Sequence, residues 1–248
     1  MHLVLLTAIG VGGATVFGSI IGFVFKKISH QFSDLVLSFA AGVMLAAAVL
    51  GLIVPSVEYG NLLITVAGIF AGAVTLNLMD RLVPHMHNLV GVDQENHPGN
   101  ANLDKVLLFV SAIAIHNLPE GIAASISFGS GNASEALLIA GGIALQNIPE
   151  GMVIIAPMLA AGISHKRTFI AAMATGVVEV AGTLLGYFAV SVSNAILPFA
   201  LAFAGGTMLY VISDEMIPET HAHGNEQGAT YALLAGFCIM LITDTLLG

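Results

Sequence analysis

Apolar residues occur in long runs separated by short polar stretches, and this pattern dominates the chain. Runs of about 18 to 25 apolar residues can cross the hydrocarbon layer of a bilayer, about 30 Å thick, as α-helices. No stretch alternates apolar and polar residues with the period of two that a membrane β-barrel requires. We therefore predict an all-α membrane protein, one transmembrane domain over residues 1–248. Its eight helices are expected at about 3–25, 35–57, 61–79, 106–128, 135–160, 168–190, 195–213 and 230–247.

The composition supports a lipid environment. Hydrophobic residues make up 57% of the 248 residues and charged residues only 8%, whereas a soluble domain carries about 25% charged residues. Lys and Arg number 6 against 15 Asp and Glu, without a basic stripe, so nucleic-acid binding is excluded. A single cysteine, Cys238, excludes a disulfide framework and a cysteine zinc cluster.

The positive charges predict the orientation of the bundle. With eight spans, every Lys and Arg falls in or beside a loop on the same side of the membrane. The positive-inside rule makes that side cytoplasmic, and both termini are then extracytoplasmic. The longest connection, 80–105, has no apolar pattern of its own and is expected to be a mobile cytoplasmic loop.

A polar phrase occurs twice inside the expected helices. The fourth helix contains H-N-L-P-E-G at 116–121, and the fifth contains Q-N-I-P-E-G at 146–151. A polar or ionisable group near the bilayer centre costs about 2.5–3.5 kcal/mol, so each one marks a functional site. Pro119 and Pro149 each remove a helical hydrogen bond, which predicts kinks in the fourth and fifth helices and free carbonyl oxygens beside the phrase.

The two phrases combine an imidazole, two carboxylates and three side-chain amides. Helix positions i, i+3 and i+4 share a face, so the members of each phrase are neighbours. Imidazole and carboxylate are ordinary ligands of zinc and other divalent metals, and the absence of thiolates argues against a tight structural zinc site. The predicted metal-binding residues are His116, Asn117, Glu120, Gln146, Asn147 and Glu150. Glu179, midway along the sixth expected helix, adds a third intramembrane acid, and the alternative is an acid satisfied by a helix neighbour.

On this repeated phrase, the chain resembles the ZIP family of zinc-regulated, iron-regulated transporter-like proteins, in their bacterial form. The resemblance extends over nearly the whole length and implies a carrier that moves zinc and related divalent metals into the cytoplasm. It implies a plasma (inner) membrane location, transported metal rather than a catalytic cofactor, no enzymatic activity, and a possible homodimer. Many members have His where this chain has Gln146, and some bacterial members have Asp where it has Asn147. These differences are expected to weaken metal binding at the site, and binding of a second metal ion in particular.

The resemblance also assigns residues beyond the repeated phrase. Glu179 corresponds to an acid at the second metal position, and Met44 lies in an A-A-G-x-M phrase that supplies a ligand. Asp214 and Glu215 match the cytoplasmic end of the seventh helix, where released metal passes. Glu58 and Asp244, near the outer ends of the second and eighth helices, are expected to gather cations.

Several loop histidines are candidate receivers of departing metal. His85, His87, His221 and His223, with Glu219, lie on the expected cytoplasmic side, and the alternative is that they are solvated loop residues. Three alternatives to a carrier remain open: a metal-selective channel, an intramembrane metalloenzyme and a transporter of organic anions or amino acids. The H-E-x-x-H phrase typical of such enzymes is absent from the sequence, and no intramembrane Arg or Lys marks an anion site.

Overall fold

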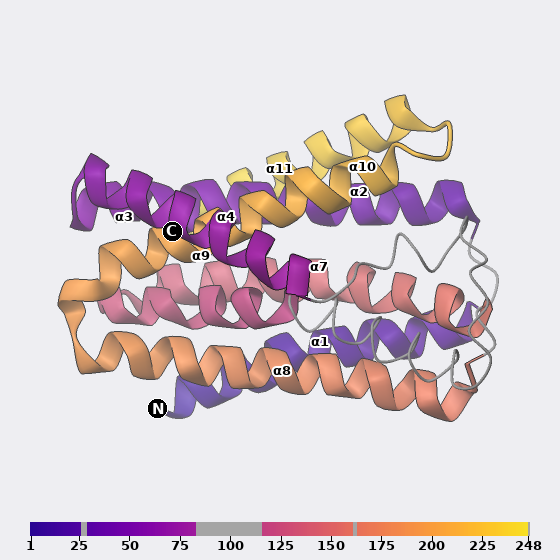
Figure 1. The fold of residues 1–248 in the computed structure, drawn as a ribbon, viewed down its shortest axis with the longest axis horizontal. Helices are drawn as coiled ribbons and strands as arrows, with labels where there is room; N and C mark the ends of the chain where they lie inside the picture. Colours follow the sequence, from indigo (N-terminus) through magenta and orange to yellow (C-terminus); the bar gives the residue numbers. More distant parts are fainter. Residues whose placement is uncertain (26–28, 83–115, 161–162, 248) are drawn as a thin grey trace.

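The computed structural model describes residues 1–25, 29–82, 116–160 and 163–247, and every regular element in these ranges is a helix (Figure 1). Seven of the helical segments are long and apolar enough to cross a membrane. The predicted all-α membrane class is therefore confirmed, and the chain is a multi-pass membrane protein. The expected fourth span lies partly outside the described residues, so the count of eight stays a prediction.

The described helices follow one another along the chain. The first part contains α1 (His2–Val24), α2 (His30–Ala46), the π-helical η1 (Ala47–Ile53), α3 (Val54–Tyr59) and α4 (Leu62–Leu82). The second part opens with a helix over 116–126 and the 3₁₀ turn η2 (Ser127–Ser130), followed by α7 (Ala133–Ala160) and α8 (His165–Val192). The last part contains η3 (Asn194–Ile196), α9 (Leu197–Val211), the π-helical η4 (Ile212–Met216), α10 (Ile217–Thr220) and α11 (Glu226–Leu247).

Side-chain caps fix where four of these helices begin. At α4, the Oδ1 of Asn61 accepts a hydrogen bond from the N–H of Ile64. Ser29 and Ser164 precede α2 and α8, and their hydroxyl oxygens accept hydrogen bonds from backbone N–H groups three residues later. Asn132 does the same for α7, because its Oδ1 accepts from the N–H groups of Ser134 and Glu135. Such caps satisfy N–H groups that have no partner inside the helix.

The helical irregularities lie before Pro55 and Pro218. The π-helical η1 separates α2 from α3, and η4 separates α9 from α10. A proline cannot donate a hydrogen bond and crowds the carbonyl four residues earlier, and a wider π turn relieves this. By contrast, α7 continues as an uninterrupted helix through Pro149. The kinks expected at Pro119 and Pro149 remain predictions.

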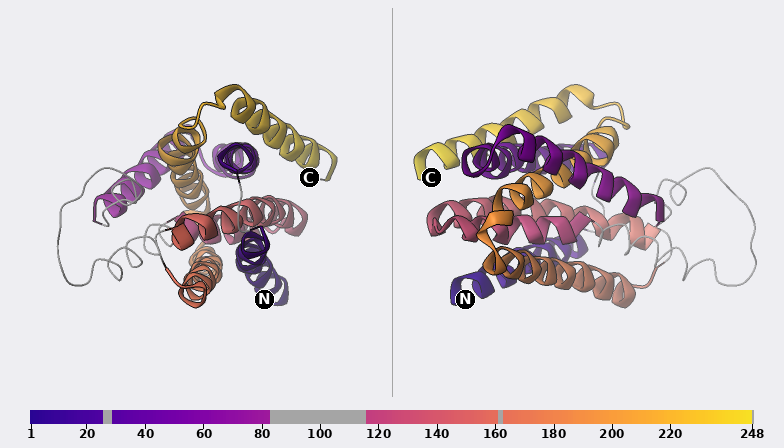
Figure 2. Two further views of the ribbon diagram at one scale, coloured as in Figure 1. Left: turned by 90° about the vertical axis from the view of Figure 1, so that its right-hand side faces the viewer. Right: turned by 60° about the vertical axis from the view of Figure 1, so that its left-hand side comes forward.

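The helices pack in two groups (Figures 1 and 2). We call α1, the helix over 116–126, α7 and α8 the motif group, because it contains both polar phrases. Within it, α1 packs along α7 and α8. We call α2 to α4 and α9 to α11, with η1 and η4, the flanking group, in which α2 packs on α11 and α4 on α9. Both termini lie toward the same end of the molecule (Figure 2).

Candidate metal centre

The second polar phrase lies in the middle of α7. Gln146 and Asn147 are completely buried, and Glu150 one turn later is half-buried. Leu145, on the opposite face, is exposed where lipid would contact the helix. The helix therefore turns its polar face inward and its apolar face outward, as the i, i+4 spacing of the phrase predicts.

The first phrase lies at the start of the described part of its helix, residues 116–126. Asn117 and Glu120 are buried, with 3% and 1% of their surfaces exposed, and His116 is half-buried. Six of the sequence-predicted metal ligands thus lie on two helices of one group. The charges of Glu120, Glu150 and Glu179 lie close enough to interact.

The glycine that ends each phrase sets how closely the helices approach. A methyl group on Gly121 would overlap the carbonyl oxygen of Glu179 in α8, and one on Gly151 would overlap that of Thr15 in α1. Small residues allow such close approach between membrane helices. Thr15 and Glu179 are themselves hydrogen-bonded, since the Thr15 hydroxyl donates to Glu179 Oε2 over 2.8 Å. The glycines therefore hold both phrases against one buried polar pair.

Glu179 and Asn147 form the centre of a hydrogen-bond network. The Asn147 Nδ2 donates to Glu179 Oε1 and, over 3.2 Å, to the carbonyl oxygen of Val11. Both carboxylate oxygens of Glu179 thus accept hydrogen bonds, one from Asn147 and one from Thr15. In this arrangement Glu179 fixes the side-chain amide of Asn147, and the Oδ1 of Asn147 points away from Glu179. The sequence could not identify Thr15 or the Val11 carbonyl, because both come from a helix without a charged residue.

Several buried polar atoms of the two phrases have no hydrogen-bond partner. They include Glu120 Oε2, both amide atoms of Gln146, and Asn147 Oδ1. A buried polar atom left unpaired costs about 1–3 kcal/mol. Oxygen atoms in this condition suit a cation, which would replace the missing donors. Within the described residues, no three His, Cys, Asp or Glu side chains are already arranged as a closed metal site.

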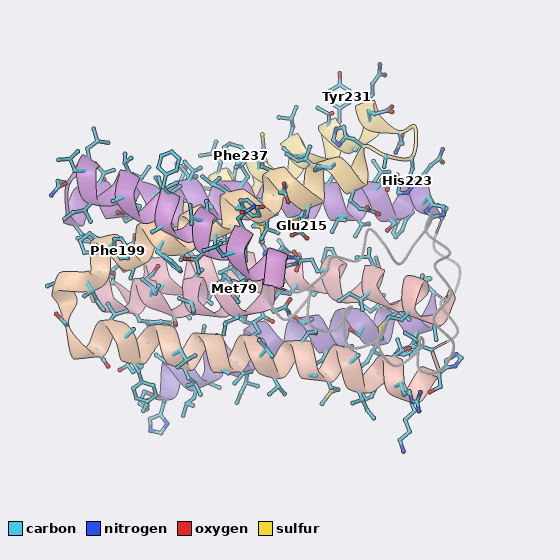
Figure 3. The ribbon with its side chains drawn as sticks, viewed as in Figure 1. Met79, Phe199, Glu215, His223, Tyr231 and Phe237 are labelled. Carbon is cyan, nitrogen blue, oxygen red and sulfur yellow. The ribbon has the colours of Figure 1, made fainter. Side chains whose placement is uncertain are left out.

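His116 lies against a residue of the flanking group. Its Nε2 is 2.8 Å from Oε1 of Glu215 on η4, yet the two atoms lack the geometry of a directed hydrogen bond. Ligands held about 2.0–2.2 Å from one metal ion lie roughly 3 Å apart. The pair is therefore spaced as two ligands of one cation are. Figure 3 shows Glu215 in the interior of the molecule.

The remaining predicted residues lie apart from this centre. Met44 is completely buried in the hydrophobic core, with Ile139 and Ile143 in the same cluster, and its role as a metal ligand stays a prediction. Glu58 is exposed and Asp244 half-buried, and the charges of both interact with Glu135 at the start of α7. Sequence reasoning missed Glu135, although its place in the first turn of a membrane helix was a usable signal.

Of the candidates expected on the cytoplasmic side, some are exposed to solvent and others belong to the turn between α10 and α11. Asp214 and Glu219 are exposed. His221 is engaged by the fold, because its Nδ1 is 2.8 Å from the Ile217 carbonyl oxygen and its Nε2 3.2 Å from the Thr230 hydroxyl. His223 contacts α2. His85 and His87 lie outside the described residues.

The family described as ZIP Zinc transporter matches residues 91–244 of the chain. The chain belongs to this family. It is similar to zinc transporter GufA of Myxococcus xanthus, with 43% identity over 73% of this chain and 70% of that protein. It is also similar to zinc transporter ZIPB of Bordetella bronchiseptica, with 36% identity over 95% and 78% of the two chains. With zinc transporter ZupT of Chlorobaculum parvum, identity is 35% over 94% and 92%. The ZIP resemblance stated from the repeated phrase is confirmed.

Proposed function

We propose that this ZIP family member moves divalent metal cations, zinc above all, across the plasma (inner) membrane into the cytoplasm. The observation that carries the proposal is the group of buried oxygen atoms without partners on Glu120, Gln146 and Asn147. An uncharged solute would not compensate two buried carboxylates, whereas a cation of charge two would. The names of the relatives, all zinc transporters, support zinc as the cargo.

The proposed site has ligands of unequal strength. Glu120 and Glu150 supply charge, and His116 supplies a nitrogen. The amides of Asn117, Gln146 and Asn147 supply neutral oxygens, which bind divalent metals more weakly than carboxylates. Such a mixture suits a cargo site that must release its ion. Glu179 acts in our proposal by holding Asn147, because both its oxygens are already engaged within the protein.

Alternating access by movement of the motif group against the flanking group is the proposed mechanism. Glu215 belongs to the flanking group and His116 to the motif group, so their contact is positioned to change when the groups move. Inward movement of a cation of charge two is favoured by about 4.6 kcal/mol per 100 mV of negative interior potential. The membrane potential alone can therefore drive uptake.

Uptake of zinc by proteoliposomes tests the proposal. The wild-type chain is expected to give saturable uptake that Glu120→Ala abolishes. Glu226→Ala, an exposed acid at the start of α11, serves as the matched control and is expected to keep wild-type uptake. Full uptake by Glu120→Ala would contradict the proposed site. Turnover too fast for a conformational cycle, without saturation, would favour a channel.

A further inference from the structure

Two histidines and a buried acid meet where the α10–α11 turn contacts α2. The Nδ1 of His223 lies 3.0 Å from Oδ1 of Asp34. The rings of His223 and His30 stack, with centroids 4.8 Å apart and planes inclined by 29°. His30 and Asp34 are four residues apart and so share a face of α2. Figure 3 shows His223 at one end of the molecule, away from Glu215 and the candidate metal centre.

The turn that carries His223 is built to bring it over α2. Gly224 has a φ of 79°, a left-handed conformation that glycine adopts without strain, and it reverses the chain after α10. His221 holds the turn in place through the Ile217 carbonyl and the Thr230 hydroxyl. His223 is therefore not needed for closing the turn, and its ring is directed at Asp34.

The burial of Asp34 is not explained by packing alone. Only 3% of its surface is exposed, and its Oδ2 has no hydrogen-bond partner. The side chain of His223 is 33% exposed and so remains open to solvent. In metal sites, a ligating histidine donates its other ring N–H to a carboxylate, which fixes the tautomer and the direction of the ring. Asp34 stands in this relation to His223, with Nε2 left for a ligand.

We infer that His223 and His30 form a second, two-imidazole site for a divalent cation of the zinc type, with Asp34 as the positioning carboxylate. An imidazole nitrogen binds metal in the plane of its ring, so the exposed His30 ring turns out of its stack on His223 when the two share an ion. Water completes the coordination. The negative charge of Asp34 offsets the positive end of the α2 dipole, which would otherwise oppose a cation near this helix terminus. Two neutral nitrogens without a thiolate bind weakly enough to release the ion. The binding chemistry stands by itself, whereas a role in receiving transported metal rests on the proposed function.

Zinc stoichiometry of the purified full-length chain in detergent tests the inference. Equilibrium dialysis is expected to show one zinc ion fewer per chain for His223→Gln and for His30→Gln. Asp34→Asn is expected to keep the site but to lower its zinc affinity by about 10- to 100-fold, the usual effect of removing such a carboxylate. His165→Gln is the control, since His165 is an exposed histidine whose ring stacks on Phe23 instead.

Thermal unfolding without metal checks that each variant is folded. If His223→Gln does not fold, His30→Gln decides the matter, because His30 is exposed and lies outside the Asp34–His223 pair. Unchanged zinc stoichiometry and affinity in folded variants would overturn the inference and leave the pair as a structural contact. The two proposals fail separately: full uptake by Glu120→Ala contradicts the transport proposal, while loss of a zinc ion in His223→Gln still supports this site.

Discussion

Glycines packed inside a helix group and glycines at the boundary between the two groups meet different atoms of the neighbouring helix. At most glycines packed between helices of one group, a methyl group would overlap a backbone carbonyl oxygen of the neighbouring helix. This holds in the motif group for Gly12, Gly18, Gly22, Gly121, Gly151, Gly176, Gly182 and Gly186, and in the flanking group for Gly42, Gly72, Gly206 and Gly236. Gly205 is an exception inside a group, since a methyl group there would meet the side chain of Ile53. Backbone packed on backbone in this way cannot slide without a clash.

Contacts between the groups are of another kind. Gly51 of η1 faces the side chain of Ile139, and Gly142 of α7 faces the sulfur of Met240. Among the polar side-chain contacts of the described residues, His116–Glu215 alone joins the two groups. Flexible side chains can rearrange where backbones cannot. Each group is therefore suited to move as a unit, and the boundary between them is suited to shift.

Cross-linking the boundary should have the largest effect. In Gly51→Cys/Ile139→Cys the two Cβ atoms lie 3.8 Å apart, inside the range of about 3.5–4.5 Å that disulfides use. With Cys238 replaced by Ser, oxidation is expected to reduce zinc uptake to that of empty proteoliposomes, and reductant to restore it. The control is the single variant Ile139→Cys, which has no second thiol to pair with once Cys238 is replaced and should keep its uptake on oxidation. Undiminished uptake with the boundary disulfide formed would argue against movement between the groups.

Enlarging a glycine inside a group should destabilise the protein more than enlarging one at the boundary. Gly151→Ala places a methyl group on the Thr15 carbonyl and is expected to cost about 1–3 kcal/mol, the usual effect of overpacking. Gly142→Ala meets the flexible Met240 side chain and is expected to cost less. Thermal unfolding in detergent compares the two variants. Equal losses would remove the distinction between the two kinds of contact.

Asn147→Asp separates the fold of the motif group from its affinity for metal. The variant loses the Nδ2 donor to Glu179 and to the Val11 carbonyl, which should cost about 1–3 kcal/mol without metal. The added carboxylate should strengthen cation binding. We therefore expect a lower melting temperature without metal and a larger rise on adding zinc. A rise no larger than that of the wild type would count against Asn147 as a ligand.

Among these four changes to the protein, Glu215→Gln should have the smallest effect. The amide keeps the size of the side chain beside His116 but removes its charge. A contact to a charged group exceeds a neutral one by about 1 kcal/mol, or roughly fivefold in a rate. Zinc uptake is expected to fall by that factor at saturating zinc. Glu226→Gln, an exposed acid at the start of α11, is the control and should leave uptake unchanged.

Local sequence was sufficient for the all-α membrane class and for the burial of the polar phrases. The cost of placing polar groups in lipid singled out the two phrases. The i, i+4 spacing placed each phrase on one helix face, and the burial of Glu120 and Gln146 agrees with that placement. It was less informative about helix irregularities. The sequence pattern gave no sign of the π-helical segments that precede Pro55 and Pro218.

Only the tertiary structure decided which helix lies beside each ligand. It paired Asn147 with Glu179 and the Val11 carbonyl, placed Glu215 against His116, buried Met44 in the apolar core, and brought Asp34 under His223. Helical periodicity depends on residues within a few positions of one another, so the amino-acid sequence expresses it directly. These contacts join residues from 32 to 189 positions apart, and they depend on which glycines let two backbones meet, a property of the assembled bundle.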